Sequence, residues 1–244
     1  MNNSDDFIST VSHELRTPLT SIRGFAQTML SSWDKLDDES KKKFLKIIED
    51  QSNRLIKLVE NMLSVTKLQN ENKSVIYSEF SIKPLIEQIG IILKNQYPTH
   101  SYIINSSPNL PEIFTDKDKL AQVMTNLLEN SFKYSPENST TEINLKCKDS
   151  NIMITVSNNG VGIDESDYDK IFTKFSRIDN PLTRKVQGAG LGLYITKSLI
   201  EKMNGEISVQ SKELNDNSGL SRITFKVKLP IINIEEQTRL KCNQ

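Results

Sequence analysis

A heptad repeat between positions 40 and 70, apolar at every position except Gln51, is the strongest constraint on the fold. Its members recur in alternating steps of four and three: Phe44, Ile48, Gln51, Leu55, Leu58, Met62 and Val65. This spacing places them along one side of a long helix and predicts coiled-coil-like packing. Residues 4–31 carry a second, broader apolar stripe. The short polar stretch between them, 31–40, favours an antiparallel helical hairpin.

Two helices cannot by themselves enclose a core around two such stripes. A homodimer in which two hairpins form a four-helix bundle would bury both stripes, and this is the arrangement we expect. Packing of the stripes against the remainder of the same chain is the alternative.

The periodicity changes near residue 75. Six segments with strand character follow, several of them alternating apolar and polar residues: 75–80, 101–106, 141–148, 152–158, 206–211 and 223–229. Helical patterns occupy 83–95, 117–133 and 191–203, with Asp116 as the expected N-cap of the second and Gly205 as the expected C-cap of the third. This mixture predicts an α/β sandwich with helices on one face of a sheet. The segment 160–190 is irregular and has the length of a lid or binding loop.

Composition limits the class of partner. The 244 residues contain 31 Lys and Arg against 31 Asp and Glu, which favours neither a nucleic-acid binder nor a membrane-surface binder. The longest run of strong hydrophobics, 89–93, is far too short to span a bilayer. Cys147 and Cys242 make no disulfide framework, so we expect a cytoplasmic segment. Whether a longer parent protein is membrane-anchored is left open by the sequence.

Five of the nine glycines form two clusters, N-N-G-V-G-I at 158–163 and G-A-G-L-G-L at 188–193. Glycine lets backbone N–H groups approach a ligand, and Gly190 and Gly192 lead into a helix whose N-terminus favours phosphate. The spacing matches neither a Walker loop nor a Rossmann fingerprint. Either cluster alone is compatible with an ordinary turn; the pair, flanking a long loop, indicates a phosphate site.

The segment 120–134 carries a row of polar side chains. Asn126, Asn130 and Lys133 share one face of a helix, whereas Val123 and Leu127 cover another. Amide oxygens and an ammonium group can hold Mg²⁺ and triphosphate oxygens. A solvated polar face is the alternative interpretation of this segment taken alone.

Two histidines are present, and they are interpreted differently. His13 lies off the apolar stripe and should be exposed, next to Glu14, which can orient the imidazole and accept its proton. His13 is therefore a candidate nucleophile. His100 lies beside a predicted turn and is interpreted as structural.

Taken together and in order, these elements resemble the sensor histidine kinases. The segments similar to the family's H, N, G1, F and G2 boxes are F-I-S-T-V-S-H-E-L-R-T-P-L-T-S-I, N-L-L-E-N-S-F-K-Y, N-N-G-V-G-I, K-I-F-T-K-F-S-R and G-A-G-L-G-L. The resemblance covers residues 5–230. It implies a dimeric hairpin domain over 1–70, a hinge at 71–74, a Bergerat-type ATP-binding α/β domain over 75–230 and a tail over 231–244.

The resemblance also implies roles for individual residues. His13 is the nucleophile and Glu14 its general base, and Glu14 and Thr17 orient water in a phosphatase reaction. Mg²⁺ is assigned to Asn130 and Asn126, and ATP to these two residues together with Lys133, Tyr134, Asn158, Gly160, Gly162, Ile163, Phe175, Gly188, Gly190, Leu191 and Gly192. Phe172, Phe175 and Arg177 belong to the lid, where Arg177 stabilises charge on the transferring phosphoryl group.

The implied function is ATP-dependent autophosphorylation of His13 and transfer of the phosphoryl group to an Asp of a response regulator receiver domain, which docks on the hairpin below His13. Asn158 departs from the family pattern, which has Asp there, and should weaken ATP binding about tenfold. One alternative is a pseudokinase scaffold that scarcely binds nucleotide. Another is a gyrase-type or chaperone-type ATPase that uses Glu129. Whether phosphorylation occurs within or between subunits depends on the hairpin turn at 33–38, and stays open.

Overall fold

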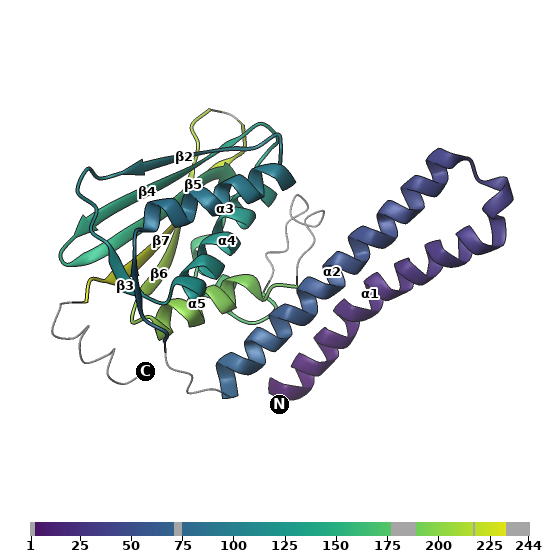
Figure 1. Cartoon of the computed structure of the whole chain (residues 1–244), viewed down its shortest axis with the longest axis horizontal. Coiled ribbons are helices and arrows are strands. Elements are labelled where there is room, and N and C mark those ends of the chain that lie inside the picture. Colours follow the sequence, from purple (N-terminus) through teal and green to yellow (C-terminus); the bar gives the residue numbers. More distant parts are fainter. Residues whose placement is uncertain (1–2, 71–74, 177–188, 217, 233–244) are drawn as a thin grey trace. The chain divides into compact units, whose positions relative to one another are not determined.

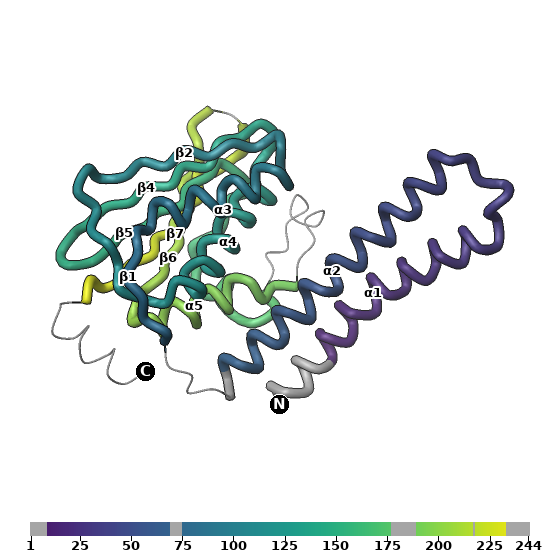
Figure 2. The backbone as a smooth tube through the Cα atoms, in the orientation of Figure 1, coloured from purple at the N-terminus to yellow at the C-terminus, as the bar shows by residue number. Residues whose placement is uncertain are grey.

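The computed structural model describes residues 3–70, 75–176, 189–216 and 218–232, with side chains from residue 9 to 68 in the first range. The chain forms two compact units, Met1–Asn70 and Glu71–Gln244. Figures 1 and 2 show the elements of both units. The expected hinge, 71–74, and most of the expected tail lie outside the described residues.

The first unit is a helical hairpin (Figure 1). Helix α1, Asn3–Ser32, is followed by a short 3-10 turn, Trp33–Lys35, and by α2, Asp38–Asn70. Asp37 caps α2 by accepting a hydrogen bond from the Ser40 backbone N–H at 2.6 Å. The polar stretch thus contains both the turn and the helix start signal.

The hairpin buries one apolar stripe and leaves another exposed. Met29, Leu58 and Val65 are buried, and the rings of Phe25 and Phe44 pack across the two helices with centroids 5.1 Å apart. A second set of apolar side chains is 50–85% exposed in the single chain: Leu19, Leu30, Leu45, Ile56 and Leu63. One hairpin alone therefore does not cover all of its apolar surface.

The second unit is a five-stranded sheet with three helices on one face (Figures 1 and 2). The strand order is β2-β4-β5-β7-β6, with β2 parallel to β4 and the other pairs antiparallel. The strands are β2 Ser101–Ser106, β4 Thr140–Lys148, β5 Asn151–Gly160, β6 Glu206–Glu213 and β7 Ser221–Pro230. The helices are α3 Ile82–Gln96, α4 Lys117–Lys133 and α5 Gly192–Lys202.

The core lies between the sheet and the helices. Along β7 every second residue is buried, as the predicted alternation requires. Leu120, Val123 and Leu127 of α4 are completely buried and face this layer. The predicted order of a helical hairpin followed by an α/β sandwich is therefore confirmed.

The prediction of a strand over 75–80 was wrong in its extent. Only Ser78–Phe80 forms a strand, β1, and it pairs with β3, Ile113–Thr115, which was not predicted. Before β1, the Ile76 backbone N–H donates a hydrogen bond to the side-chain carboxylate of Asp116 at 3.0 Å and not to a neighbouring strand. The same carboxylate caps α4 through the Lys119 N–H at 3.0 Å, as predicted.

The end of α5 also differs from the prediction that Gly205 is its C-cap. Met203 is the C-cap, and Asn204 takes the left-handed conformation with φ of 55°. The Gly205 N–H then bonds to the Ile200 carbonyl at 2.9 Å, which is the pattern of a Schellman motif. Asn tolerates this conformation, so glycine was not needed at that position.

Candidate active site

The candidate nucleophile lies on the exposed side of α1. Pro18 is buried and Leu15 is half-buried, and their orientation leaves His13 exposed, as predicted. One turn later, the Thr17 hydroxyl donates to the His13 carbonyl oxygen at 3.3 Å. The imidazole is therefore accessible to an incoming group while its backbone is held in a continuous helix.

Glu14 is held from the second helix. Nη2 of Arg54, on α2, lies 3.3 Å from Oε2 of Glu14, and both side chains are partly buried, with exposures of 23% and 20%. This ion pair orients the carboxylate beside the candidate nucleophile. The sequence did not reveal Arg54, because it lies beside the apolar seam and belongs to no recognised motif.

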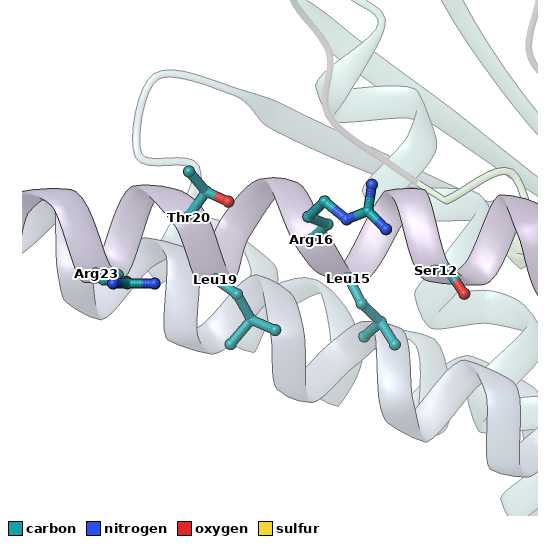
Figure 3. Close-up of a pocket in the computed structure, with 6 residues that line it drawn as sticks. All are labelled: Ser12, Leu15, Arg16, Leu19, Thr20 and Arg23. Carbon is teal, nitrogen blue, oxygen red and sulfur yellow. The ribbon is translucent and has the colours of Figure 1, made fainter.

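A groove follows α1 from His13 toward the hairpin turn. Its volume is about 420 Å³, and it is lined by Ser12, Leu15, Arg16, Leu19, Thr20 and Arg23. In Figure 3, Leu15 and Leu19 point to one side of the helix and Arg16 and Thr20 to the other. The groove next to the nucleophile is therefore lined by two arginines and two leucines.

The polar row on α4 divides into three different environments. Asn126 donates from Nδ2 to Thr196 Oγ1 of α5 at 2.8 Å. Lys133 pairs with Glu129, with Nζ 2.8 Å from Oε1. Asn130 is half-buried, and its side chain has no hydrogen bond to another described residue. Of the two asparagines, Asn130 is therefore the one whose side-chain amide is available to a ligand.

The first turn of α5 packs tightly on Asn126. A Cβ on Gly192 would lie 2.3 Å from Asn126 Oδ1, so a larger residue there would displace the Asn126 amide. Gly190 has φ of +66°, and a Cβ there would lie 2.6 Å from the Ser176 carbonyl and 2.7 Å from that of Phe175. Glycines 190 and 192 thus bring the end of the lid segment, the start of α5 and the polar row of α4 together.

The end of β5 meets the end of α4. Asn158, only 3% exposed, donates from Nδ2 to Ser135 Oγ at 2.8 Å. A Cβ on Gly160 would lie 2.1 Å from the Tyr134 carbonyl oxygen, and the Val161 N–H bonds to that oxygen at 3.4 Å. The predicted residues Asn158, Gly160 and Tyr134 are therefore close together.

The remaining loop after β5 is held by β6 and β7. The Ile163 N–H donates to Ser211 Oγ at 3.1 Å, and a Cβ on Gly162 would lie 2.6 Å from Ser221 Oγ. Phe172, in the expected lid, is buried and packs edge-on against Phe225. Leu191, the residue before α5, is completely buried. Arg177 and Gly188 lie outside the described residues.

Tyr97, His100 and Glu129 of α4 form a polar cluster. Burial, the charge of Glu129 and a hydrogen bond to Glu129 together raise the pKa of Tyr97 to about 12. His100 is buried and stacks on Phe132 with centroids 5.4 Å apart. Glu129 is thereby engaged by both Tyr97 and Lys133.

Sequence reasoning missed Ser135 and Thr196, which bind two of the predicted site residues. Both are common hydroxyl residues outside any glycine or asparagine pattern, so no signal pointed to them. Among the described residues, no group of three or more His, Cys, Asp or Glu side chains forms a metal site. A metal ion here would need amide and phosphate oxygens as ligands.

Two family models match the chain. The His Kinase A (phospho-acceptor) domain matches residues 3–71, and the histidine kinase-, DNA gyrase B- and HSP90-like ATPase matches residues 115–231. Among curated proteins, the sensor protein kinase WalK of Staphylococcus aureus is 35% identical over 217 residues, which is 85% of this chain. The chain spans between 34% and 50% of the length of the WalK sequences that it matches.

Solved structures share the fold. The histidine kinase ThkA, in complex with response regulator protein TrrA, has a TM-score of 0.70 at 23% identity over 93% of this chain and 61% of its own. The histidine kinase AdeS of Acinetobacter baumannii has a TM-score of 0.66 at 23% identity over 91% of this chain and 98% of its own. Within the described residues, none of the helices is long and apolar enough to cross a membrane.

Proposed function

Because this chain carries the phospho-acceptor and ATPase domains of the histidine kinases and belongs to that family, we propose that it phosphorylates its own His13 with ATP and then phosphorylates a response regulator. The observation that carries the proposal is an exposed His13 next to Glu14, whose carboxylate is held by Arg54, on one unit, together with the matched ATPase domain on the other. The γ-phosphoryl group leaves ADP and bonds to an imidazole nitrogen of His13. Glu14 takes the proton from the other ring nitrogen.

The phosphate end of the proposed nucleotide site is assigned to the start of α5 and the end of α4. Gly190 and Leu191 lead into α5 and Gly192 begins it, so their backbone N–H groups belong to a helix N-terminus, where phosphate is favoured. Lys133 leaves its short ion pair with Glu129 to meet a phosphate, which is feasible because its side chain is 27% exposed. Phe175, beside Gly190, is assigned to close this end. Gly188 and Arg177, which lie outside the described residues, are assigned to it on the resemblance alone.

Mg²⁺ is the metal that this site fits. Asn130 offers an amide oxygen with no partner among the described residues, and Asn126 keeps its oxygen toward Gly192 while its nitrogen is bound to Thr196. Two amides, with no carboxylate cluster in the part of the chain that the structure describes, suit an ion that receives most of its ligands from triphosphate oxygens and water. When bound, the ion neutralises charge that develops on the phosphates.

The base end of the proposed nucleotide site is assigned to the turn after β5. Asn158 faces the adenine amino group, Tyr134 lies near the nucleoside, and Gly160, Gly162 and Ile163 shape the loop between them. The contact between Gly160 and the Tyr134 carbonyl supports this assignment, since it joins the two segments at one point.

The expected homodimer would cover the apolar side chains that a single hairpin leaves exposed. Leu30, Leu45 and Ile56 are 85%, 52% and 56% exposed in the single hairpin. A second hairpin packed on these side chains completes a four-helix bundle and removes that apolar surface from water.

The receiver domain is proposed to dock in the groove beside His13. Arg16 and Arg23 supply positive charge there, and Leu15 and Leu19 supply apolar contact. The relative ThkA, solved with the response regulator TrrA, supports a partner of this class. A receiver Asp then takes the phosphoryl group from His13. Glu14 and Thr17 orient a water molecule that later hydrolyses this aspartyl phosphate to inorganic phosphate.

A gyrase-type ATPase is disfavoured by the surroundings of Glu129. Glu129 is 8% exposed and accepts a hydrogen bond from Tyr97, so its carboxylate is poorly placed to activate water even when Lys133 turns to a phosphate. A pseudokinase would rest on Asn158 alone, while the polar row of α4 and both glycine contacts are intact.

Labelling with γ-³²P-ATP tests the proposal. We expect label that is labile in acid, stable in base, absent in His13→Gln and transferable to a receiver domain. Asn130→Asp, folded and dimeric, should also lose the label. A folded, dimeric wild-type protein without label, or label that survives in His13→Gln, would contradict the proposed function.

A further inference from the structure

Two consecutive hydrogen bonds run from the end of α4 to Asn158. Ser135 Oγ lies 2.6 Å from the carbonyl oxygen of Ser131, and Asn158 Nδ2 lies 2.8 Å from Ser135 Oγ. A carbonyl oxygen can only accept, so the single hydroxyl proton of Ser135 goes to Ser131. The Ser135 oxygen is then left as an acceptor, and it needs an N–H donor from Asn158.

This arrangement fixes which way the Asn158 amide points. If the amide were turned over, Oδ1 would face Ser135 Oγ, and two acceptors would meet with no proton between them. Asn158 is 3% exposed, so water would not compensate for the lost bond. Nδ2 also lies on the packed side, 3.1 Å from the position of a Cβ on Gly160. Oδ1 therefore points the other way, and no described residue donates a hydrogen bond to it.

We propose that Ser135 is a positioning residue that makes Asn158 an acceptor toward the base and thereby selects 6-amino purines over 6-oxo purines. This rests on the proposed function, in which Asn158 faces the base. An Asp at this position would present an acceptor in either orientation. An Asn presents an acceptor or a donor, depending on how it is turned. Without Ser135, the same asparagine could accept from an amino group or donate to a carbonyl.

Adenine and hypoxanthine nucleotides separate these possibilities, because adenine has an amino donor at the 6-position and hypoxanthine a carbonyl acceptor. We expect Mg²⁺–ADP to bind the wild-type chain roughly tenfold more tightly than inosine diphosphate. Asn158 Oδ1 accepts a hydrogen bond from the adenine amino group, whereas it meets the hypoxanthine carbonyl with no proton between the two oxygens. Diphosphates are used because they avoid phosphoryl transfer. Isothermal titration calorimetry gives both dissociation constants.

Ser135→Ala should bring the ratio of the two dissociation constants to within about threefold of unity, because the freed amide can turn. Ser135→Thr keeps the hydroxyl and should keep the wild-type ratio. In an Asn158→Asp background the preference for ADP should persist, and Ser135→Ala should leave it unchanged. Circular dichroism establishes that each variant is folded.

The outcomes distinguish failure of the proposed nucleotide site from failure of the positioning role of Ser135. If the folded wild-type chain binds neither nucleotide, the proposed nucleotide site fails. If both bind and Ser135→Ala leaves the ratio unchanged, the positioning role is wrong while the nucleotide site stands. The role is also overturned if Ser135→Ala abolishes binding of both nucleotides, or lowers the ratio equally in the Asn158→Asp background, because Ser135 would then act through packing.

Discussion

Arg54 of α2 reaches Glu14 of α1, forty positions earlier, with Nη2 3.3 Å from Oε2. The pair joins the two helices of the hairpin next to His13. A glutamate side chain on a helix surface has many rotamers, and its function as a base requires one of them. The second helix therefore contributes to the chemistry of the first by limiting where this carboxylate can point.

Replacing Arg54 by glutamine should slow phosphorylation of His13 roughly tenfold, since a positioned base contributes about 10²–10⁴ and part of that positioning is lost. The free energy of unfolding should fall by less than about 1 kcal/mol, which is the usual worth of a partly exposed pair. The initial rate of labelling measures the first effect.

Lys46→Gln is a matched control, because it removes a cation of α2 that pairs with Glu49 on the same helix. Its labelling rate should equal that of the wild type. In a Glu14→Gln background, Arg54→Gln should have no further effect on rate. An additive loss in that double variant would show that Arg54 acts independently of Glu14.

Asn158→Asp should strengthen ATP binding by about tenfold, because a charged acceptor makes a stronger hydrogen bond than a neutral amide oxygen. The Ser135 hydroxyl can turn to donate to the carboxylate, which exchanges its hydrogen bond to the Ser131 carbonyl for one to a charged acceptor. Equilibrium titration with Mg²⁺–ATP gives the dissociation constant. An affinity equal to or below that of the wild type would refute the charge argument.

Asp116 should stabilise the second unit in a pH-dependent way. Burial would raise its pKa, but hydrogen bonds from the Lys119 side chain and from the Lys119 and Ile76 N–H groups outweigh burial and lower the pKa. A lowered folded-state pKa adds stability above the ordinary Asp value of about 3.9 that is lost as pH falls through the folded value. At pH 7, Asp116→Ala should cost about 2 kcal/mol.

Urea unfolding at pH 7 and at pH 3 checks this prediction. All six tyrosines lie in the second unit and the single tryptophan, Trp33, lies in the hairpin, so tyrosine emission reports the relevant transition. The difference between wild type and Asp116→Ala should shrink at pH 3. A constant difference would mean that capping geometry alone, without charge, carries the effect.

Two glycine substitutions should act in opposite directions. Gly24→Ala places its Cβ in open space on α1 and should stabilise the hairpin by about 0.5–1 kcal/mol. Gly160→Ala places its Cβ 2.1 Å from the Tyr134 carbonyl and should destabilise the second unit by about 1–3 kcal/mol.

Urea titrations at one protein concentration separate the two effects, because Trp33 fluorescence follows the hairpin and tyrosine fluorescence follows the second unit. A fixed concentration is needed because dimerisation shifts apparent stability. If Gly160→Ala unfolds at the wild-type midpoint, the close approach of Gly160 to Tyr134 is not a constraint on the fold.

Much of the architecture follows from local periodicity. The steps of four and three around Leu58, and the alternation around Phe225, each determine which face of an element is apolar. The start of α4 was also predictable, because Asp116 caps it three residues before Lys119. The strand β3 was missed because its three residues are too few to show any period.

The candidate site divides in the same way. The amino-acid sequence by itself determined the types of element and the motifs that mark His13, Asn130, Asn158 and Gly192, since periodicity and motif spacing depend only on near neighbours along the chain. The tertiary structure alone decided that Arg54 braces Glu14 and that Ser135 turns the Asn158 amide. Those partners lie forty and twenty-three residues away. The direction of a hydrogen bond depends on which groups packing brings within about 3 Å.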